Sequence, residues 1–186
     1  MQRELGITFV HVTHTQLEAI ALADLVVVME KGKIRQAGPA RDVYDSPKDR
    51  YVAEFLGGQN VLSGQIQSVN GQHAVMAAAA GGGIRVPLTP GVNLSTGDAI
   101  ALAVRRDDID LIRPSDKPPA RESTVEMASR VRAIEYQGYF VKVMLDAGSS
   151  ADFVVYVPER KFFSNPFGIG DTVLATWPIN VARVLR

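Results

Sequence analysis

From about Asn60 onward, the sequence is a series of short apolar segments separated by glycine, asparagine, aspartate and proline. Short segments that alternate between apolar and polar residues, with turn residues between them, are typical of an all-β sandwich or barrel. The candidate strands are 62–69, 74–77, 83–86, 99–104, 109–112, 126–136, 139–145, 152–157, 172–177 and 181–185. We therefore predict an all-β domain over residues 60–186.

A short internal repeat divides this β region. The sequence GDAIALA at 97–103 is echoed by GDTVLAT at 170–176, and QIQSV at 65–69 is echoed by RVRAI at 130–134. A stiff, polar connection at 113–119, rich in proline, lies between the copies. The pattern indicates two half-repeats, 60–113 and 124–186, which form two small barrels or the two halves of one assembly. Chance similarity is the alternative for matches this short.

The first 59 residues follow a different pattern, in which strands and helices are mixed. The run ITFVHV at 7–12 is apolar and β-branched, which predicts a strand buried on both faces, as in a parallel sheet. The other predicted elements are a helix at 13–23, a buried strand at 25–29, a turn at Gly32, a strand at 33–36, and helices at 38–44 and 46–56. Ser46 is expected to cap the last helix, with Pro47 in its first turn, and Gly57-Gly58 to end it.

Composition narrows the chemistry available to the chain. Lys+Arg and Asp+Glu both number 20, so the net charge is zero, which argues against a nucleic-acid partner. The chain has no cysteine, which excludes a thiolate metal site, a disulfide and a cysteine nucleophile. Its three histidines are scattered, so we predict no metal site. We expect His11 to be packed within a strand and His73 to be exposed in a turn.

Several segments, taken in order, resemble one family. Val12–Ala19 (VTHTQLEA) and Val28–Ile34 (VMEKGKI) resemble the H-loop, the following helix and the terminal hairpin of ABC ATPase domains. Gly38–Gly57 resembles the segment that leaves the ATPase core in binding-protein-dependent importers. Ala103–Ile109 (AVRRDDI) resembles the "VRPEDI" signature of the transport-associated OB (TOBE) domain, with Arg106 where proline is usual. The resemblance implies an α/β remnant of an ABC ATPase domain over 1–59, followed by an all-β OB-like (TOBE) barrel domain over 60–186.

The resemblance assigns a role to His14. In this family the matching histidine reaches the γ-phosphate of ATP, and a position just after a buried strand is where α/β folds place ligands. The alternative is a surface histidine that begins the next helix. Thr15 stands where the family usually has aspartate, so a capping hydroxyl is kept and a carboxylate is lost. Gln16 and Glu18 are second-tier candidates, for which a solvated helix face is the simpler interpretation.

The resemblance also implies partners and a limit on activity. No G-x-x-x-x-G-K-[ST] loop exists in the sequence, so the residues that grip ATP and Mg²⁺ are expected in a front half outside this chain. The parent would be an ATP-hydrolysing translocase, whereas this chain alone is predicted to be inactive. Its expected partners are a second copy of the ATPase subunit, permease membrane subunits and, indirectly, an external solute-binding protein. The expected location is the cytoplasmic face of the membrane, and the solute class is sugars, polyamines or iron, with polyamines favoured.

Other functions are open on the sequence alone. A stand-alone OB-type module could bind a small anion at Arg105-Arg106, although Asp107-Asp108 beside it favours a solvated turn. A third alternative is a hydrolase that uses the carboxylates of Asp107, Asp108 and Asp110, but the sequence shows no histidine partnered with them. Leu56–Gln59 (LGGQ) looks like part of an ABC signature but is interpreted as a helix end and linker. Most aromatic residues of the β region are expected in the core, and the remainder could support dimer contacts: Tyr136, Tyr139, Phe140, Phe153, Phe162, Phe163, Phe167 and Trp177.

Overall fold

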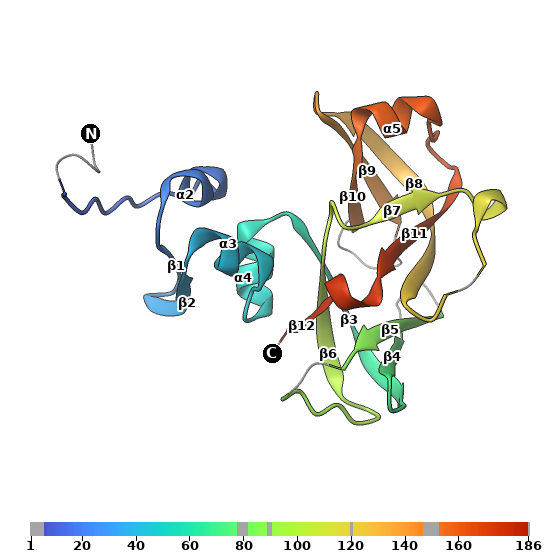
Figure 1. Ribbon diagram of the computed structural model, residues 1–186, viewed down its shortest axis with the longest axis horizontal. Coiled ribbons are helices and arrows are strands. Elements are labelled where there is room, and N and C mark those ends of the chain that lie inside the picture. The colour runs from blue at the N-terminus through green and yellow to red at the C-terminus, as the bar shows by residue number, and fades with distance from the viewer. Residues whose placement is uncertain (1–5, 78–81, 89–90, 120, 147–152, 186) are drawn as a thin grey trace. The chain divides into compact units, whose positions relative to one another are not determined.

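The computed structural model describes residues 6–77, 82–88, 91–119, 121–146 and 153–185 (Figure 1). The chain divides into two compact units, the first of which ends at Gly57 and the second of which begins at Gly58. Within the described ranges, no helix combines the length and the apolar character needed to cross a membrane.

The N-terminal unit combines short helices with one β-hairpin. Its elements are α2 (Gln16–Leu22), β1 (Val26–Glu30), β2 (Lys33–Gly38), α3 (Ala40–Asp45) and α4 (Arg50–Leu56). β1 pairs antiparallel with β2, and the turn between them has positive φ at Lys31 and at Gly32, where φ is 77°. The turn predicted at Gly32 is therefore confirmed, because glycine adopts this backbone conformation without steric cost.

One face of the hairpin forms the core of this unit. Val26 and Val28 of β1 are buried together with Val43 of α3 and with Val52 and Leu56 of α4. Burial alternates along β1, so its other face is exposed. The strand predicted at 25–29 is confirmed, but it is buried on one face only.

Residues 7–12 form no strand, so the first predicted strand is wrong for this chain. Val10 is 89% exposed and Val12 is 91% exposed, and His11, expected to be packed, is exposed as well. A strand needs neighbours that pair its N–H and C=O groups, and an interior strand also needs layers that cover both faces. Among the described residues of the N-terminal unit, the only sheet is the β1–β2 hairpin, and it does not include this segment.

The start of α4 also differs from the prediction. Asp49, not Ser46, is its N-cap, and the Asp49 side chain accepts a hydrogen bond of 2.9 Å from the backbone N–H of Val52. Ser46 instead follows the end of α3. Gly57, with φ of 66°, ends α4 as predicted.

The second unit is all β, apart from short helical turns, and consists of two antiparallel sheets. Its strands are β3 (Gln59–Val69), β4 (His73–Ala77), β5 (Gly83–Pro87), β6 (Ala99–Arg105), β7 (Asp110–Ile112), β8 (Thr124–Tyr136), β9 (Phe140–Asp146), β10 (Phe153–Pro158), β11 (Thr172–Pro178) and β12 (Arg183–Leu185). The strand orders are β12-β6-β3-β4-β5 and β7-β11-β8-β9-β10. Each predicted β segment has a counterpart, with Asp152 outside the described residues.

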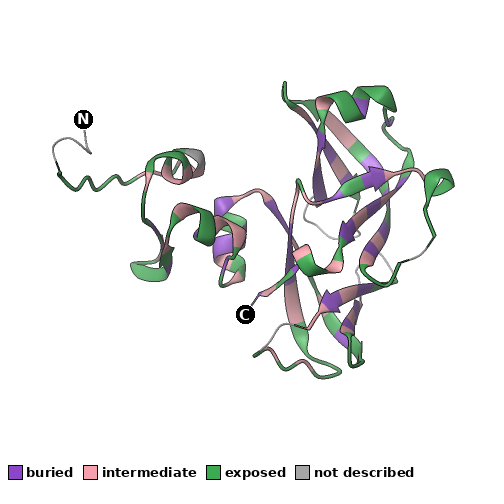
Figure 2. Ribbon diagram, viewed as in Figure 1, coloured by how far each residue is buried: buried purple, intermediate pink, exposed green. Residues whose placement is uncertain are grey.

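The two halves of this unit exchange their last strands. β7 follows β6 in the chain but pairs with β11 of the second half, and β12 returns to pair with β6 of the first half. Neither sheet is therefore made from one half alone. Figure 2 shows buried residues on strands of both halves, and they form one continuous hydrophobic cluster that includes Leu102, Val131, Val143 and Trp177.

Long, bent strands lie at the centre of both sheets. β3 pairs with β6 along its first part and with β4 along its second, with a register shift between Ile66 and Ser68. β8 does the same with β11 and β9, with a shift between Val131 and Ala133. Such bulges bend a strand and let it serve two pairings, which is how a sheet begins to close on itself.

The two copies of the sequence repeat occupy equivalent places at these bends. Ile66 donates to the Asp98 carbonyl at 2.9 Å and accepts from Gly97 at 2.8 Å. Val131 makes the same pair of bonds with Asp171 and Gly170, at 2.9 and 2.8 Å. The glycine of each repeated Gly-Asp pair is required because its φ is near 90°, where a side chain would be strained.

Two connections of the β unit were not predicted in detail. Pro114–Asp116 forms a single 3₁₀ turn within the proline-rich connection, and another lies at Ile179–Val181. The region 158–170, for which no helix is predicted, contains α5 (Glu159–Ser164). Six residues are too few to show a helical period, and the buried side chain of Phe162 holds this helix on the core.

Candidate functional site

His14 lies two residues before the start of α2, and its neighbours hold the chain there. The Thr13 hydroxyl oxygen accepts a hydrogen bond of 2.9 Å from the Thr15 backbone N–H and donates one of 3.1 Å to Glu18 Oε2. Thr15 is the N-cap of α2, but its side chain makes no capping hydrogen bond. The expected cap from the Thr15 hydroxyl is therefore not made, and the Thr13 hydroxyl instead holds the turn that precedes α2.

The imidazole of His14 is exposed to solvent. His11 lies on the same extended segment, with its Nε2 atom 3.7 Å from Glu18 Oε2. Glu18 therefore contacts both Thr13 and His11 and helps to order the segment around His14. An exposed imidazole can donate a hydrogen bond to a phosphate oxygen. The other groups that phosphoryl transfer requires are not gathered around it among the described residues.

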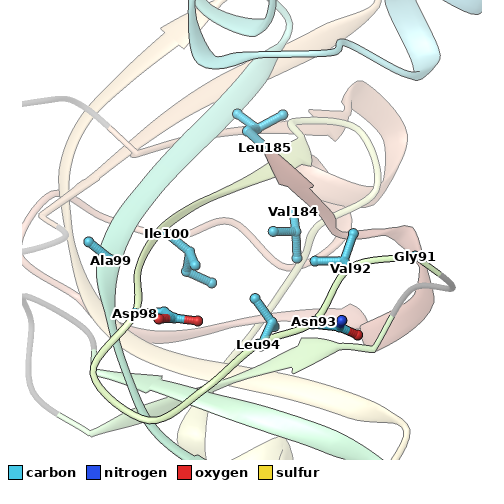
Figure 3. A pocket seen from close by; sticks show the side chains of 9 residues that line it. All are labelled: Gly91, Val92, Asn93, Leu94, Asp98, Ala99, Ile100, Val184 and Leu185. Atoms are coloured by element: carbon cyan, nitrogen blue, oxygen red, sulfur yellow. The ribbon is translucent and has the colours of Figure 1, made fainter.

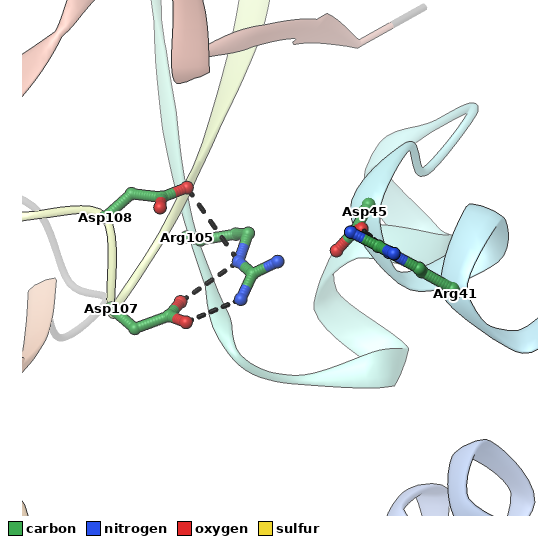
Figure 4. A network of polar contacts seen from close by, with 5 residues as sticks. All are labelled: Arg41, Asp45, Arg105, Asp107 and Asp108. Carbon is green, nitrogen blue, oxygen red and sulfur yellow. Dashed lines mark hydrogen bonds and ion pairs between the residues drawn. The ribbon is translucent and has the colours of Figure 1, made fainter.

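Arg105 ends β6 in a compact cluster of opposite charge (Figure 4). Its guanidinium contacts both oxygens of Asp107, at 3.0 and 2.5 Å, and lies 3.8 Å from Asp108. Partial burial raises the pKa of Asp107, but the hydrogen bond and charge of Arg105 outweigh it, so this pKa lies below its usual value. Figure 4 also shows Arg41 and Asp45, an exposed pair within α3 that adds little stability.

Arg106, the departure from the family signature, joins the turn after β6 to β10. Its Nη1 atom donates to the Tyr156 hydroxyl at 3.0 Å, and its guanidinium lies 5.6 Å from the centre of that ring. Its backbone N–H donates to Gly58, and its carbonyl accepts from the Tyr156 N–H. The buried Nε of Arg106 has no hydrogen-bond partner within the described structure.

These contacts bear on the predicted anion site and on the carboxylate cluster. Both arginines are engaged with protein groups, so an anion would have to displace Asp107 and Asp108 or the Tyr156 contact. Asp110 is separate from that cluster and pairs with Lys161 of α5 at 2.5 Å. The three aspartates thus lie in surface ion pairs, and no histidine contacts them in the described interactions.

A shallow cavity of about 490 Å³ lies between residues 91–98, the start of β6 and β12 (Figure 3). Its lining is Gly91, Val92, Asn93, Leu94, Asp98, Ala99, Ile100, Val184 and Leu185. The Asp98 carboxylate accepts a hydrogen bond of 2.7 Å from the Ser95 N–H, so it serves the loop itself. The cavity is open and holds no set of converging catalytic groups.

The aromatic residues of the β region are divided between core and surface. Core positions are confirmed for Phe153, Phe162, Phe167 and Trp177. The exposed remainder includes Tyr136, Tyr139 and Phe163. Tyr136 lies 6.1 Å from Phe163 between ring centres, and its hydroxyl donates to Glu159 at 3.2 Å. The negative charge of Glu159 raises the pKa of Tyr136. His73, expected to be exposed, is half-buried at the start of β4.

Two buried amides carry structural roles that sequence reasoning missed. Asn60 bonds both backbone groups of Val154, and Gln36 bonds the Ser46 carbonyl at 3.0 Å and the Lys48 N–H at 2.8 Å. A polar residue at a strand position that should be apolar is the one signal that could have identified them.

Residues 102–185 match the family model described as the TOBE domain, so the β unit carries a domain of this class. A solved structure of the cytoplasmic molybdate-binding protein ModG has a similar fold, with a TM-score of 0.58, 16% identity, and coverage of 67% of this chain and 94% of that one. The OB-like β fold predicted from the sequence is therefore confirmed.

The whole chain, moreover, is similar to the C-terminal portion of the ATP-binding subunits of ABC importers. It is 34% identical over 184 residues to the spermidine/putrescine import ATP-binding protein of Oleidesulfovibrio alaskensis, which covers 95% of this chain and 48% of that protein. It is 32% identical over 187 residues to the protein of that name from Ruegeria pomeroyi, covering all of this chain and 48% of that protein. The chain thus spans about half the length of these curated relatives.

Proposed function

We propose that this chain is the C-terminal part of the ATP-hydrolysing subunit of an ABC importer for polyamines. The observation that carries the proposal is the similarity to spermidine/putrescine import ATP-binding proteins along 95% of the chain, across both units. In this proposal residues 1–59 are the end of an α/β nucleotide-binding domain, and residues 60–186 are its OB-like regulatory domain.

His14 is the proposed catalytic-site residue, acting in the complete subunit. Its exposure before α2, on a segment ordered by Thr13 and Glu18, leaves the imidazole free to approach a ligand. A neutral imidazole there would donate a hydrogen bond to the γ-phosphate of ATP, whose Mg²⁺ and remaining ligands belong to the front half. The chain alone is then expected neither to bind ATP tightly nor to hydrolyse it.

The β unit is proposed to serve dimerisation or regulation rather than chemistry. The exposed aromatic residues Tyr136, Tyr139 and Phe163 offer apolar surface for protein contacts. The partners in this proposal are a second ATPase subunit and the permease subunits, which would keep the protein at the cytoplasmic face of the membrane. A solute-binding protein outside would act through the permease.

The proposal is tested with a fusion of this chain to the front half of the Oleidesulfovibrio alaskensis relative. We expect the fusion to hydrolyse ATP and to restore spermidine uptake in a strain that lacks its own import ATPase. His14→Ala should lower ATP turnover by at least about 100-fold, because the γ-phosphate loses a donor whose contact is strongest in the transition state. ATP binding should be largely retained, because the other phosphate ligands belong to the front half. A His14→Ala fusion with undiminished turnover would contradict the role of His14.

The alternative is a stand-alone OB-type module for a small anion. Its support is the fold shared with ModG, and the ion pairs of Arg105 stand against it. Calorimetric titration of the chain with molybdate, sulfate and ATP separates the two proposals, since only the alternative predicts tight binding of an oxyanion by this chain alone.

A further inference from the structure

The turn between β3 and β4 contains the one asparagine of the sequence that is followed by glycine, Asn70-Gly71. Both residues are exposed, and the Asn70 backbone N–H donates to the His73 carbonyl at 3.0 Å, which closes the hairpin. Asparagine is a thermally labile side chain. Its Cγ can be attacked by the backbone nitrogen of the next residue, which closes a succinimide ring, and glycine favours this step because it has no Cβ beside that nitrogen.

The turn holds the side-chain carbonyl of Asn70 with two hydrogen-bond donors. Its Oδ1 accepts from the backbone N–H of Gln72 at 3.0 Å and from that of His73 at 2.8 Å. Paired N–H groups directed at a carbonyl oxygen stabilise the negative charge that develops there when a nucleophile attacks the carbon. The Asn70 amide is therefore polarised as an electrophile.

The leaving group of such an attack lies beside a histidine. Nδ2 of Asn70 is 3.4 Å from Nε2 of His73, whose side chain is half-buried at the start of β4. Once Cγ has been attacked, Nδ2 is an amine with a free lone pair, so it can take a proton from the imidazolium form of His73. Protonation lets this nitrogen leave as ammonia.

The surroundings of Gly71 leave room for the attack. A Cβ built on Gly71 would meet nothing within 4 Å, so the space around this residue is open. Ring closure requires the peptide between Asn70 and Gly71 to rotate toward Cγ. An exposed turn around a glycine permits this rotation, because no packed side chain has to move with it.

The four other asparagines of the sequence lack this combination. Asn60 is buried, and both polar atoms of its amide are hydrogen-bonded. Asn165 precedes a proline, which has no N–H to lose. Asn93 and Asn180 are exposed, but they precede leucine and valine, whose side chains crowd the attacking nitrogen.

We propose that Asn70 is a self-modification site, at which the β3–β4 turn converts asparagine to aspartate and isoaspartate without an enzyme. The Gly71 nitrogen bonds to Cγ of Asn70 and loses its proton to solvent. The Cγ–Nδ2 bond breaks, and ammonia leaves with a proton from His73, which solvent replaces. Water then opens the succinimide: cleavage of the new Cγ–N bond gives aspartate, and cleavage of the original peptide C–N bond gives isoaspartate.

The two products have different effects on the hairpin. Aspartate keeps an oxygen that can accept from the N–H groups of Gln72 and His73, and it adds a negative charge to the turn. Isoaspartate carries the main chain through Cβ and Cγ, which lengthens the turn and displaces the N–H that closes it. The amides of the neighbouring pair, Val69 and Ala74, should then exchange hydrogen faster.

The test incubates the purified 186-residue chain at neutral pH and follows its peptides by mass spectrometry with electron-transfer fragmentation, which separates aspartate from isoaspartate. Asn70 should convert at least about tenfold faster than Asn93, the exposed reference in the same chain. In urea the Oδ1 atom loses its two donors, so conversion of Asn70 should be at least about threefold slower. Equal or faster conversion in urea would show that the turn does not assist the reaction and would overturn the proposal.

Two variants test the reacting groups, and circular dichroism verifies that both remain folded. Gly71→Ala should slow conversion at least about tenfold, because a Cβ then crowds the attacking nitrogen. His73→Gln should slow it at least about threefold, because glutamine is polar but cannot donate a proton to the leaving nitrogen. An unchanged rate in the Gly71→Ala chain would overturn the proposal, and an unchanged rate in the His73→Gln chain would exclude His73 as the proton donor.

This inference is independent of the proposed function. It involves neither His14 nor a front half, so an absence of conversion at Asn70 would overturn the inference and leave the proposed function as it stands. Conversely, rapid conversion at Asn70 in a chain whose fusion hydrolyses no ATP would support the inference and contradict the proposed function.

Discussion

The side chain of Asn60 hydrogen-bonds both backbone groups of Val154. Its Nδ2 donates to the Val154 carbonyl at 2.8 Å, and its Oδ1 accepts from the Val154 N–H at 2.8 Å. Asn60 is buried near the start of β3, and Val154 belongs to β10, an edge strand of the other sheet. One amide thus replaces a strand neighbour at the edge of β10 and ties the two sheets together.

Asn60→Leu should lower the free energy of unfolding by about 2–4 kcal/mol, because it leaves a buried N–H and a buried C=O of Val154 without partners. Urea denaturation of the chain measures the loss. Asn93→Leu is the control, since Asn93 is exposed, and it should change stability by less than about 0.5 kcal/mol. Equal effects of the two substitutions would contradict the role given to Asn60.

Gly64→Ala should destabilise the β unit by about 1–3 kcal/mol through overpacking. A Cβ at this position would overlap the Ala77 carbonyl oxygen and the Met76 side chain, so the strand pair β3–β4 would have to separate locally. Gly71→Ala is the matched control, because a Cβ there meets nothing within 4 Å and its φ is not positive. Thermal melts of both variants measure the effect, and only the Gly64 variant should have a lower melting temperature than the unmodified chain.

Tyr156→Phe should cost about 1–2 kcal/mol of stability, because it removes the acceptor of a charged donor on Arg106. Tyr139→Phe, at a position 94% exposed, should be neutral within about 0.5 kcal/mol. A double-mutant cycle with Arg106→Ala isolates the pair. Strict additivity in that cycle would mean that the two side chains do not stabilise each other.

The cluster of Arg105 and Asp107 should stabilise the fold only when Asp107 is ionised. The pKa of Asp107 is lower in the folded chain than the usual 3.8, so its contribution is present above that value and is lost as the pH falls through the folded pKa. Asp107→Asn should therefore be slightly destabilising at pH 7 and have no effect near pH 2. Because the carboxylate is half exposed, solvent keeps the effect small. Denaturation curves at both pH values test this, and a larger effect in acid would contradict the sign.

Local patterns in the sequence were enough to predict the strands of the β unit. Alternation of apolar residues predicted the strands, and the Gly-Asp repeat marked two positions that the structure shows to be equivalent at Ile66 and Val131. The alternation depends only on neighbouring residues in the chain. The positive φ of each turn is indicated by a single glycine. The partner of Asn60 and the exchange of β7 and β12 could not be predicted, because they depend on which distant strands meet.

The N-terminal unit shows where local patterns fail. Residues 7–12 carry a strong strand signal, yet the only sheet among the described residues of this unit is the β1–β2 hairpin, which does not include them. Ser46 matched a capping pattern, but Asp49 lies where its carboxylate reaches the Val52 N–H. His14 was singled out by its resemblance to an ATPase motif, and the structure gives its exposure and neighbours while its role stays a prediction.

The crossing of β7 and β12 has a consequence for biosynthesis. β6 is made early, but its outer neighbour β12 is the last strand of the domain to leave the ribosome. Until then the hydrogen-bonding groups along that side of β6 are unpaired, although the rest of its sheet has been translated. The domain should consequently complete its folding after translation rather than half by half during it, and a nascent chain halted before residue 183 should be sensitive to proteases.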